Sequence, residues 1–185
     1  MTKRVMILAT DGFEQSELEK PKANLEKAGI ETEVVSLENG MIRGWKDKDW
    51  GDAIKVDKTV DQVSSCEGYD ALLLPGGQMN PDILRMNEKA VGIVEMFGKA
   101  GKPIAAICHA PWLLAEAGLI DGKTVTGWPS IRTDLKNAGA KVVDEEAAVD
   151  GNLITSRNPD DIPAFSKALI DMLGESVAQG QLEAA

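Results

Sequence analysis

Two adjacent residues, Cys108 and His109, are the strongest candidates for chemistry in this sequence. They follow a short, largely apolar run at residues 103–107 and precede Pro111, a pattern that predicts a buried strand ending sharply before a helix. A side chain at such a turn is exposed at the carboxyl edge of a sheet, where the first amide groups of the helix face a bound group. The helix N-terminus and the imidazole would both favour the thiolate of Cys108, which attacks carbonyl carbons. The alternative is a buried core cysteine followed by a surface histidine. Because His109 is the only histidine in the chain, its position here favours the nucleophile.

Composition excludes several classes of protein. The chain has 185 residues, with 43% hydrophobic and 27% charged residues, as expected of a globular protein. We expect a single domain over residues 1–174 and a frayed or lightly docked tail over residues 175–185. With 20 basic and 30 acidic residues, the net charge of −10 disfavours nucleic acid and anionic membranes as partners. The apolar run at residues 5–9 is too short for a signal peptide, so we expect a cytoplasmic protein.

Cofactor and metal motifs are missing from the sequence. It contains no Gly-x-Gly-x-x-Gly pattern, so a dinucleotide site has no support. One histidine and two distant cysteines, Cys66 and Cys108, make a zinc site improbable. We therefore expect no cofactor, no metal and two reduced thiols.

Strand and helix patterns alternate along nearly the whole chain. Apolar runs that predict strands are followed by amphipathic stretches that predict helices, which indicates an α/β fold with a doubly wound, mostly parallel sheet and helices on both faces. The polar stretch at residues 38–57 indicates a hairpin outside this alternation. A long helix is predicted from Asn80, as its cap, to Phe97. In such a fold the loops at residues 11–14, 75–80 and 108–111 meet at one edge of the sheet.

Five motifs together resemble the PfpI family of intracellular cysteine enzymes, in the class I glutamine amidotransferase-like superfamily. They are Asp-Gly-Phe-Glu-Gln-Ser-Glu-Leu at 11–18, Leu-Pro-Gly-Gly at 74–77, Ala-Ile-Cys-His-Ala-Pro at 106–111, Gly-Trp-Pro-Ser-Ile-Arg at 127–132 and Val-Asp-Gly-Asn-Leu-Ile-Thr-Ser-Arg at 149–157. The resemblance runs from the first strand to the last helix. It implies a flavodoxin-like sheet, a homo-oligomer of dimers or hexamers, and a role in stress survival with peptidase, glyoxalase or deglycase activity.

The resemblance also assigns roles to individual residues. Cys108 would be the nucleophile and His109 its base. Glu14 would lie beside the sulfur and share a proton with it, because burial and a nearby negative charge keep a carboxyl group protonated. The backbone amides of Gly77 and His109 would form an oxyanion hole. Asp82, at the start of the helix after Pro-Gly-Gly, would reach the histidine from a neighbouring subunit.

Two further positions are candidates for substrate binding, and two classes of function stay open. Trp128 and Arg132 could line the mouth of the pocket. In the enzyme interpretation, the thiolate attacks a small carbonyl compound such as methylglyoxal, one of its adducts, or a peptide. In the alternative, the protein is a redox sensor or a holdase-type stress protein whose Cys108 is oxidised without turnover. The histidine directly after the cysteine favours turnover, because a sensor needs no proton shuttle.

Overall fold

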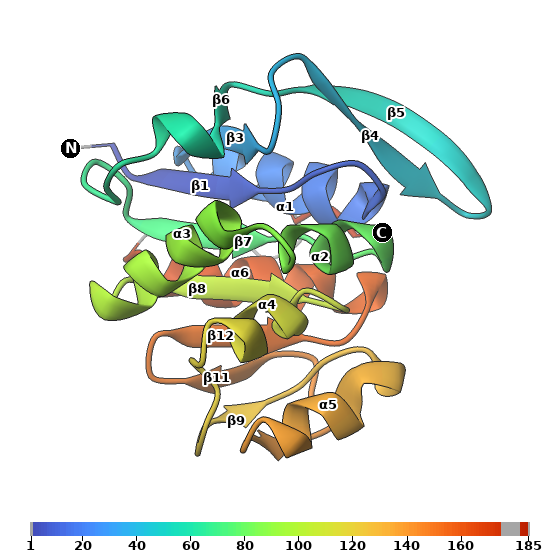
Figure 1. The fold of residues 1–185 in the computed structure, drawn as a ribbon, viewed down its shortest axis with the longest axis vertical. Helices are drawn as coiled ribbons and strands as arrows, with labels where there is room; N and C mark the ends of the chain where they lie inside the picture. The colour runs from blue at the N-terminus through green and yellow to red at the C-terminus, as the bar shows by residue number, and fades with distance from the viewer. Residues whose placement is uncertain (1, 175–181, 185) are drawn as a thin grey trace.

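The computed structural model describes residues 2–174 and 182–184, and a mostly parallel sheet forms the centre of this part of the chain (Figure 1). Seven strands lie in the order β11-β12-β8-β7-β1-β3-β6. They are β1 (Arg4–Leu8), β3 (Glu31–Ser36), β6 (Lys58–Thr59), β7 (Ala71–Leu74), β8 (Ile104–Ile107), β11 (Ala148–Asp150) and β12 (Leu153–Ser156). Every neighbouring pair is parallel except β11 with β12, which form an antiparallel hairpin. The predicted α/β fold class is confirmed.

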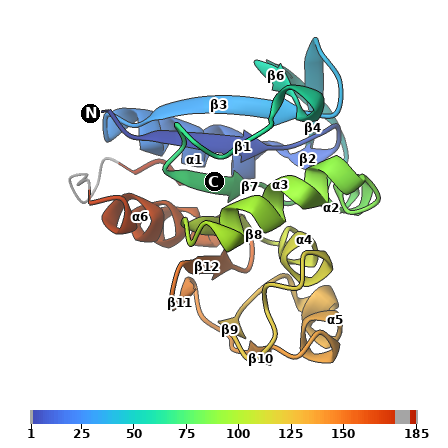
Figure 2. The same cartoon turned by 60° about the vertical axis from the view of Figure 1, so that its left-hand side comes forward.

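Helices cover both faces of this sheet (Figure 2). On one face lie α1 (Gln15–Lys27) and α6 (Ile162–Met172); on the other lie α2 (Met79–Leu84), α3 (Glu88–Lys99), α4 (Pro111–Glu116) and α5 (Arg132–Asn137). Side chains along a strand point alternately to the two faces. In β1, Val5 and Ile7 accordingly pack toward α1 and α6, while Met6 and Leu8 belong to the opposite core. Each central strand is therefore buried on both sides.

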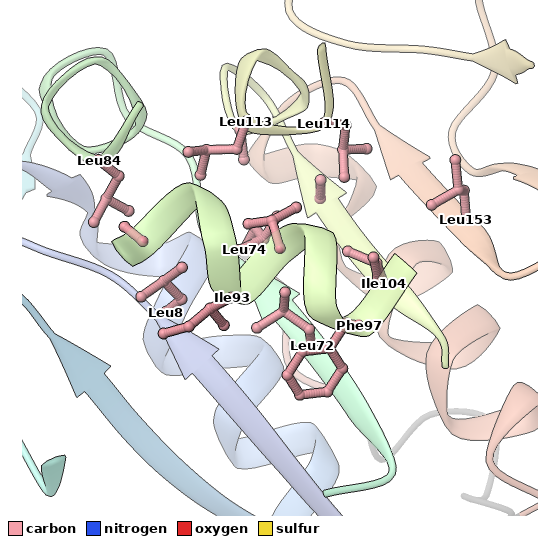
Figure 3. Packing of buried hydrophobic residues seen from close by; sticks show 14 of the residues in the cluster. Leu8, Leu72, Leu74, Leu84, Ile93, Phe97, Ile104, Leu113, Leu114 and Leu153 are labelled. Carbon is pink, nitrogen blue, oxygen red and sulfur yellow. The ribbon is translucent and has the colours of Figure 1, made fainter. Parts of the chain in front are cut away.

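The hydrophobic core on the α3 side packs on the three central strands, β1, β7 and β8. Leu72 and Leu74 of β7 meet Ile93 and Phe97 of α3 in the cluster of Figure 3. All four side chains are essentially inaccessible to water. Burying a large apolar side chain of this kind contributes about 1.5 to 3 kcal/mol. This packing fixes the carboxyl ends of β7 and β8, from which the site loops leave.

The stretch from residue 79 to residue 99 differs from the single helix that the sequence predicts. It forms two helices, α2 and α3, separated by residues 85–87. Asn87 caps the second one, since its side chain accepts hydrogen bonds from the amides of Lys89 and Ala90. Asn80 is not a cap but a buried residue inside α2. Because of this break, the orientation of α2 at the carboxyl edge of the sheet is independent of that of α3.

Smaller elements form two further sheets and three short helices beside the central sheet. β4 (Met41–Lys46) and β5 (Asp49–Lys55) form a hairpin (Figure 1), which confirms the predicted excursion, and β4 pairs with β2 (Phe13–Glu14). β9 (Thr124–Val125) and β10 (Lys141–Val142) form a separate parallel pair. Three short 3-10 helices are η1 (Val60–Gln62), η2 (Pro129–Ile131) and η3 (Pro159–Asp161). Of these pieces, η2 lies beside the site described below.

The end of the chain is described only in part. Of the tail expected at residues 175–185, residues 175–181 and 185 lie outside the described residues. Glu183 contacts α1: its carboxylate accepts from Lys20 at 3.0 Å and its amide donates to the side chain of Asn24 at 2.6 Å. Across the described ranges, no helix has the length and apolar character needed to cross a membrane.

Candidate active site

The turn after β8 displays Cys108 in a strained backbone conformation. Its φ angle is 65°, in the left-handed region that residues other than glycine rarely adopt. Neighbouring loops hold this turn on both sides: the Cys108 amide donates to the Ser156 carbonyl at 3.0 Å, and the Trp128 amide donates to the Cys108 carbonyl at 2.8 Å. α4 begins three residues later at Pro111. This is the sharp strand-to-helix turn that the sequence predicts.

The side chains of Cys108 and His109 meet, although adjacent residues of an extended strand would point to opposite faces. The distance from Cys108 Sγ to His109 Nδ1 is 3.2 Å, within reach of a proton transfer. Two indoles pack on the imidazole: Trp128 stacks on it with ring centroids 5.7 Å apart, and Trp112 meets it edge-on at 5.3 Å. Cys108 is 5% exposed and His109 8%. The pair is pre-positioned and almost closed to water.

The carboxyl group beside the sulfur belongs to Glu17, not to Glu14 as the sequence analysis expects. Glu17 is fully buried, interacts with the Cys108 side chain, and accepts a hydrogen bond from the Gly76 amide at 3.0 Å. Glu14 precedes the helix, is half-buried, and accepts from Ser16 at 3.1 Å. α1 starts at Gln15, and its turn directs Glu17 toward the sheet while Glu14 borders a surface cavity.

The spacing of the apolar residues could have revealed this. Among the buried residues of α1, Pro21 and Leu25 are apolar, and Glu17 lies one turn before the first and two turns before the second on the same face. A carboxyl group aligned with a buried helix face is the one that reaches the interior. Its second oxygen, Oε1, is buried without a hydrogen-bond partner, which suits a carboxyl group that keeps its proton.

Burial and charge set the protonation of the three central groups. Burial, with the charge of Glu14 as a smaller cause, raises the pKa of the Glu17 carboxyl to about 8. Burial also raises the pKa of the Cys108 thiol, with Glu17 as the next cause, while the amides of Gly77 and His109 act in the opposite direction. Burial lowers the pKa of His109. Each of these shifts favours the neutral form of its group, a thiol beside a carboxylic acid and an uncharged imidazole, and so opposes the thiolate expected from the sequence.

The loop after β7 brings backbone amides to the sulfur. Gly77, with a φ angle of 84°, and His109 both direct their N–H groups at Cys108 Sγ. Gly76 lies so close to the turn that a Cβ there would be 2.6 Å from the Ile107 carbonyl and 2.4 Å from Glu17 Oε2. Only glycine fits at such an approach.

Asn80 holds this loop against the end of β1, a role that sequence reasoning missed. Its side chain accepts from the Thr10 amide at 2.8 Å and donates to the carbonyls of Pro75 at 2.8 Å and Gly76 at 3.2 Å. The local Asn-Pro-Asp pattern indicates a helix cap, so the sequence carried no signal for these longer-range bonds.

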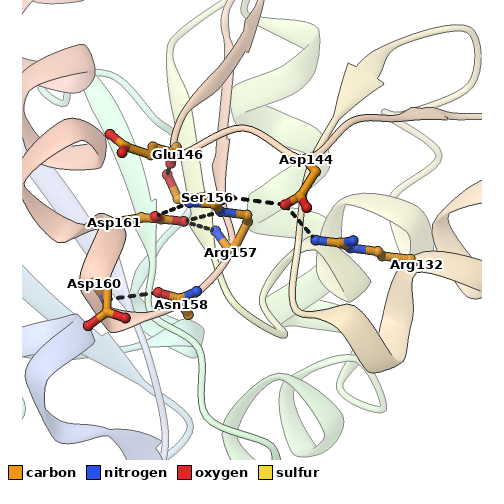
Figure 4. Close-up of polar contacts among 8 residues, drawn as sticks. All are labelled: Arg132, Asp144, Glu146, Ser156, Arg157, Asn158, Asp160 and Asp161. Atoms are coloured by element: carbon orange, nitrogen blue, oxygen red, sulfur yellow. Dashed lines mark hydrogen bonds and ion pairs between the residues drawn. The ribbon is translucent and has the colours of Figure 1, made fainter.

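The other predicted site residues are not all gathered around the sulfur. Trp128 covers His109, and Asp82 is exposed on α2. Arg132 points to Asp144, which also pairs with Arg157 (Figure 4). Arg157 in turn binds the buried Asp161 through two nitrogens. The network joins α5 to the end of β12, and Arg132 has no contact with Cys108 or His109.

The mostly parallel sheet of this order defines a flavodoxin-like α/β protein, and it carries a cysteine and a histidine at the turn after a central strand. The chain belongs to the DJ-1/PfpI family, whose sequence profile matches residues 3–172. This confirms the resemblance drawn from the motifs.

Relatives and solved structures agree with this assignment. The chain is 42% identical over 175 residues to protein/nucleic acid deglycase 2 of Escherichia coli, covering 94% of this chain and 99% of that one. It is 42% identical over 174 residues to general stress protein 18 of Bacillus subtilis, with the same coverage. It also resembles the crystal structure of a two-domain protein from Anabaena variabilis containing DJ-1/ThiJ/PfpI-like and ferritin-like domains, at a TM-score of 0.88 and 38% identity. That match covers 94% of this chain and 48% of the other, so the chain spans about half of that protein.

Proposed function

We propose that this chain is a stress-protection enzyme that uses Cys108 to attack reactive carbonyl compounds, either methylglyoxal or its adducts with amines. The observation that carries the proposal is the 3.2 Å contact between Cys108 Sγ and His109 Nδ1, which provides a nucleophile with a base already in reach. The names of the relatives, a deglycase and a stress protein, support the same substrate class.

The neutral resting site fits this chemistry. As Cys108 Sγ attacks the aldehyde carbon of methylglyoxal, its proton passes to Nδ1 of His109. The new C–S bond forms while the electron pair of the C=O bond moves to oxygen, which then takes the proton from Nδ1 and yields a hemithioacetal. Loss of the proton on the first carbon and protonation of the ketone oxygen give an enediol, and protonation of the second carbon with loss of the hydroxyl proton from the first gives a lactoyl thioester. Water then hydrolyses the thioester to lactate and the free thiol.

Two features stabilise charge along this path. A protonated Glu17 donates a hydrogen bond to the sulfur while it carries negative charge, and the amides of Gly77 and His109 face the same region. Groups fixed in place before the reaction cost no reorganisation when charge develops. Glu17 thus takes the role that the sequence analysis assigned to Glu14.

Limited access favours a small substrate over a peptide. Cys108 and His109 are 5% and 8% exposed, and Trp128 covers the imidazole ring. An extended peptide would need an open groove along the sulfur. A three-carbon aldehyde, or the end of a glycated side chain, needs far less room. We keep Trp128 as a candidate wall of the substrate site and Arg132 as a candidate at its rim.

Assembly enters the proposal through Asp82. This residue is exposed on α2, where an acid could serve a second copy of the chain. In a dimer or hexamer it could approach His109 of the neighbouring subunit. The soluble, cytoplasmic oligomer that the sequence analysis expects is part of this proposal.

The deciding experiment is methylglyoxal consumption by the purified full chain, with lactate followed by NMR and a peptide substrate run in parallel. We expect wild type to form lactate and Cys108→Ser to be at least a hundredfold slower. Cys66→Ser is the matched control, because Cys66 is also buried but its sulfur faces the carbonyl of Met96; it should keep its activity.

Two outcomes would contradict the proposal. Peptide cleavage without loss of methylglyoxal would identify a peptidase. No turnover of any substrate, with peroxide converting Cys108 to a sulfinic acid by intact mass, would favour the redox or holdase alternative.

A further inference from the structure

The ring nitrogen of His109 that lies away from Cys108, Nε2, faces a hydroxyl group that has no role in the mechanism proposed above. The Oγ atom of Ser130 lies 3.4 Å from His109 Nε2, while Nδ1 on the other side of the ring faces the sulfur. Within the described residues, this is the only side-chain oxygen in hydrogen-bond reach of Nε2. The imidazole therefore lies between the thiol and the hydroxyl.

The chemistry of the pair demands a particular tautomer. For Nδ1 to accept the thiol proton it must be unprotonated, so the neutral ring has to carry its proton on Nε2. A ring that is 8% exposed and packed between two indoles has little water to bind that N–H. A side-chain oxygen at Nε2 can accept from that N–H and so favour this tautomer, and Ser130 Oγ occupies that position.

The backbone couples Ser130 to the reactive turn. Ser130 is the middle residue of η2 (Pro129–Ile131), whose Pro129 restricts the backbone and whose Ile131 is fully buried. The residue before η2, Trp128, donates its amide to the Cys108 carbonyl at 2.8 Å. The segment that carries the hydroxyl is thus hydrogen-bonded directly to the nucleophile.

We propose that Ser130 is a positioning residue that accepts a hydrogen bond from Nε2–H of His109 and so holds Nδ1 ready to take the thiol proton. The inference deepens the proposed function and rests on it for its kinetic consequences. An acid from a second copy, such as Asp82, would have to approach the same nitrogen, so the two assignments can be tested against each other.

The charged groups near the ring are few in the part of the chain that the structure describes. Glu17 interacts with the Cys108 side chain, Arg85 lies over the Trp112 ring, and Asp134 accepts from the Trp112 indole at 2.9 Å. None of these groups contacts the imidazole directly, so no ion pair with the ring complicates the interpretation of a substitution at Ser130.

The test uses the fact that His109 is the only histidine in the chain. Long-range 1H–15N correlations on the 15N-labelled full-length protein report its tautomer and titration without assignment. We expect the Nε2–H tautomer to predominate in wild type, and Ser130→Ala to show a mixture of tautomers. The pKa of His109 should also fall in this variant, because imidazolium loses an acceptor.

Kinetics and rescue complete the test. Ser130→Ala should lower kcat about three- to tenfold with KM within about twofold, the size of one neutral hydrogen bond, and Ser130→Thr should restore both the tautomer and kcat. The matched control is Thr133→Ala, the loss of another exposed hydroxyl on the adjoining helix, which should change neither. All variants are checked for unchanged thermal unfolding.

Two results would overturn the inference. One is an unchanged tautomer and pKa of His109 in Ser130→Ala. The other is an altered tautomer in Asp82→Asn with none in Ser130→Ala, which would assign the role to the acid. If wild type turned over no carbonyl substrate but Ser130→Ala still changed the tautomer, the proposed function would fail while the hydrogen bond stood.

Discussion

The carboxyl group of Glu17, on the first helix, lies against the thiol of Cys108, at the end of a strand near the middle of the sheet. The carboxyl residue has no exposed surface and the cysteine has 5%. Burial and the proximity of the two acidic groups raise the pKa of both. Removing the thiol proton therefore needs a base, and His109 Nδ1 is the base within reach.

The rate should depend on pH in a bell-shaped manner. Activity should rise as His109 loses its proton, and this rise should come below the ordinary pKa of histidine because burial lowers the pKa of His109. Activity should fall again as Glu17 loses its proton near pH 8. Glu17→Gln keeps a hydrogen-bond donor but cannot ionise, so it should lose the alkaline limb. Glu14→Gln should change kcat/KM less than about threefold across the range. If Glu14→Gln removed the alkaline limb and Glu17→Gln did not, Glu14 would be the carboxyl group that acts on the sulfur, as the sequence predicts.

Stability should fall as pH rises through the same window. The folded-state pKa of Glu17 is raised to about 8 from its ordinary value of 4.5, so between these values the folded chain holds a proton that the unfolded chain has released. The free energy of unfolding then decreases with pH by at most about 1.4 kcal/mol per unit and levels off above pH 8. Urea unfolding at pH 5.5 and pH 8 should show this decrease in wild type relative to Glu17→Gln. The exposed Glu67→Gln serves as control and should follow wild type at both pH values.

Two glycine substitutions should change stability in opposite directions. Gly76→Ala places a methyl group 2.6 Å from the Ile107 carbonyl and 2.4 Å from Glu17 Oε2, so it should destabilise the protein by about 1 to 3 kcal/mol and reduce activity. Gly92→Ala meets nothing within 4 Å inside α3 and should stabilise by about 0.5 to 1 kcal/mol. Thermal unfolding of both variants decides this. Equal effects would mean that the close approach at Gly76 relaxes at little cost.

Replacing Asn80 should cost more stability than replacing a residue that only caps a helix. Asn80→Ala leaves the Thr10 amide and the Pro75 carbonyl without their partner and removes one of the two donors to the Gly76 carbonyl, which also accepts from the Glu14 amide; we expect a loss of about 2 to 4 kcal/mol. Asn87→Ala removes only the cap of α3 and should cost about 1 kcal/mol. Chemical denaturation of the two variants compares these losses, and equal values would argue against a joining role for Asn80.

Local sequence was enough to predict the alternating strands and helices, the turn at Cys108 and the glycine loop before it. These features depend on near neighbours along the chain: apolar runs, a proline at a helix start, and glycines where a turn is tight. The motifs added the family, and the family added the expectation of a buried carboxyl group beside the sulfur.

Only the tertiary structure decided which residues complete the site. Glu14 and Glu17 are three residues apart in one motif, and the starting point of α1 and its packing on the sheet turn one inward and leave the other at the surface. The sequence predicts Asn80 to be a helix cap, and only the fold places the end of β1 beside it. Nothing in the sequence marks Ser130, whose role depends on the packing of its loop over His109. In each case the deciding contact joins segments far apart in sequence. Local propensity fixes the elements, whereas the register between packed elements fixes which side chains meet.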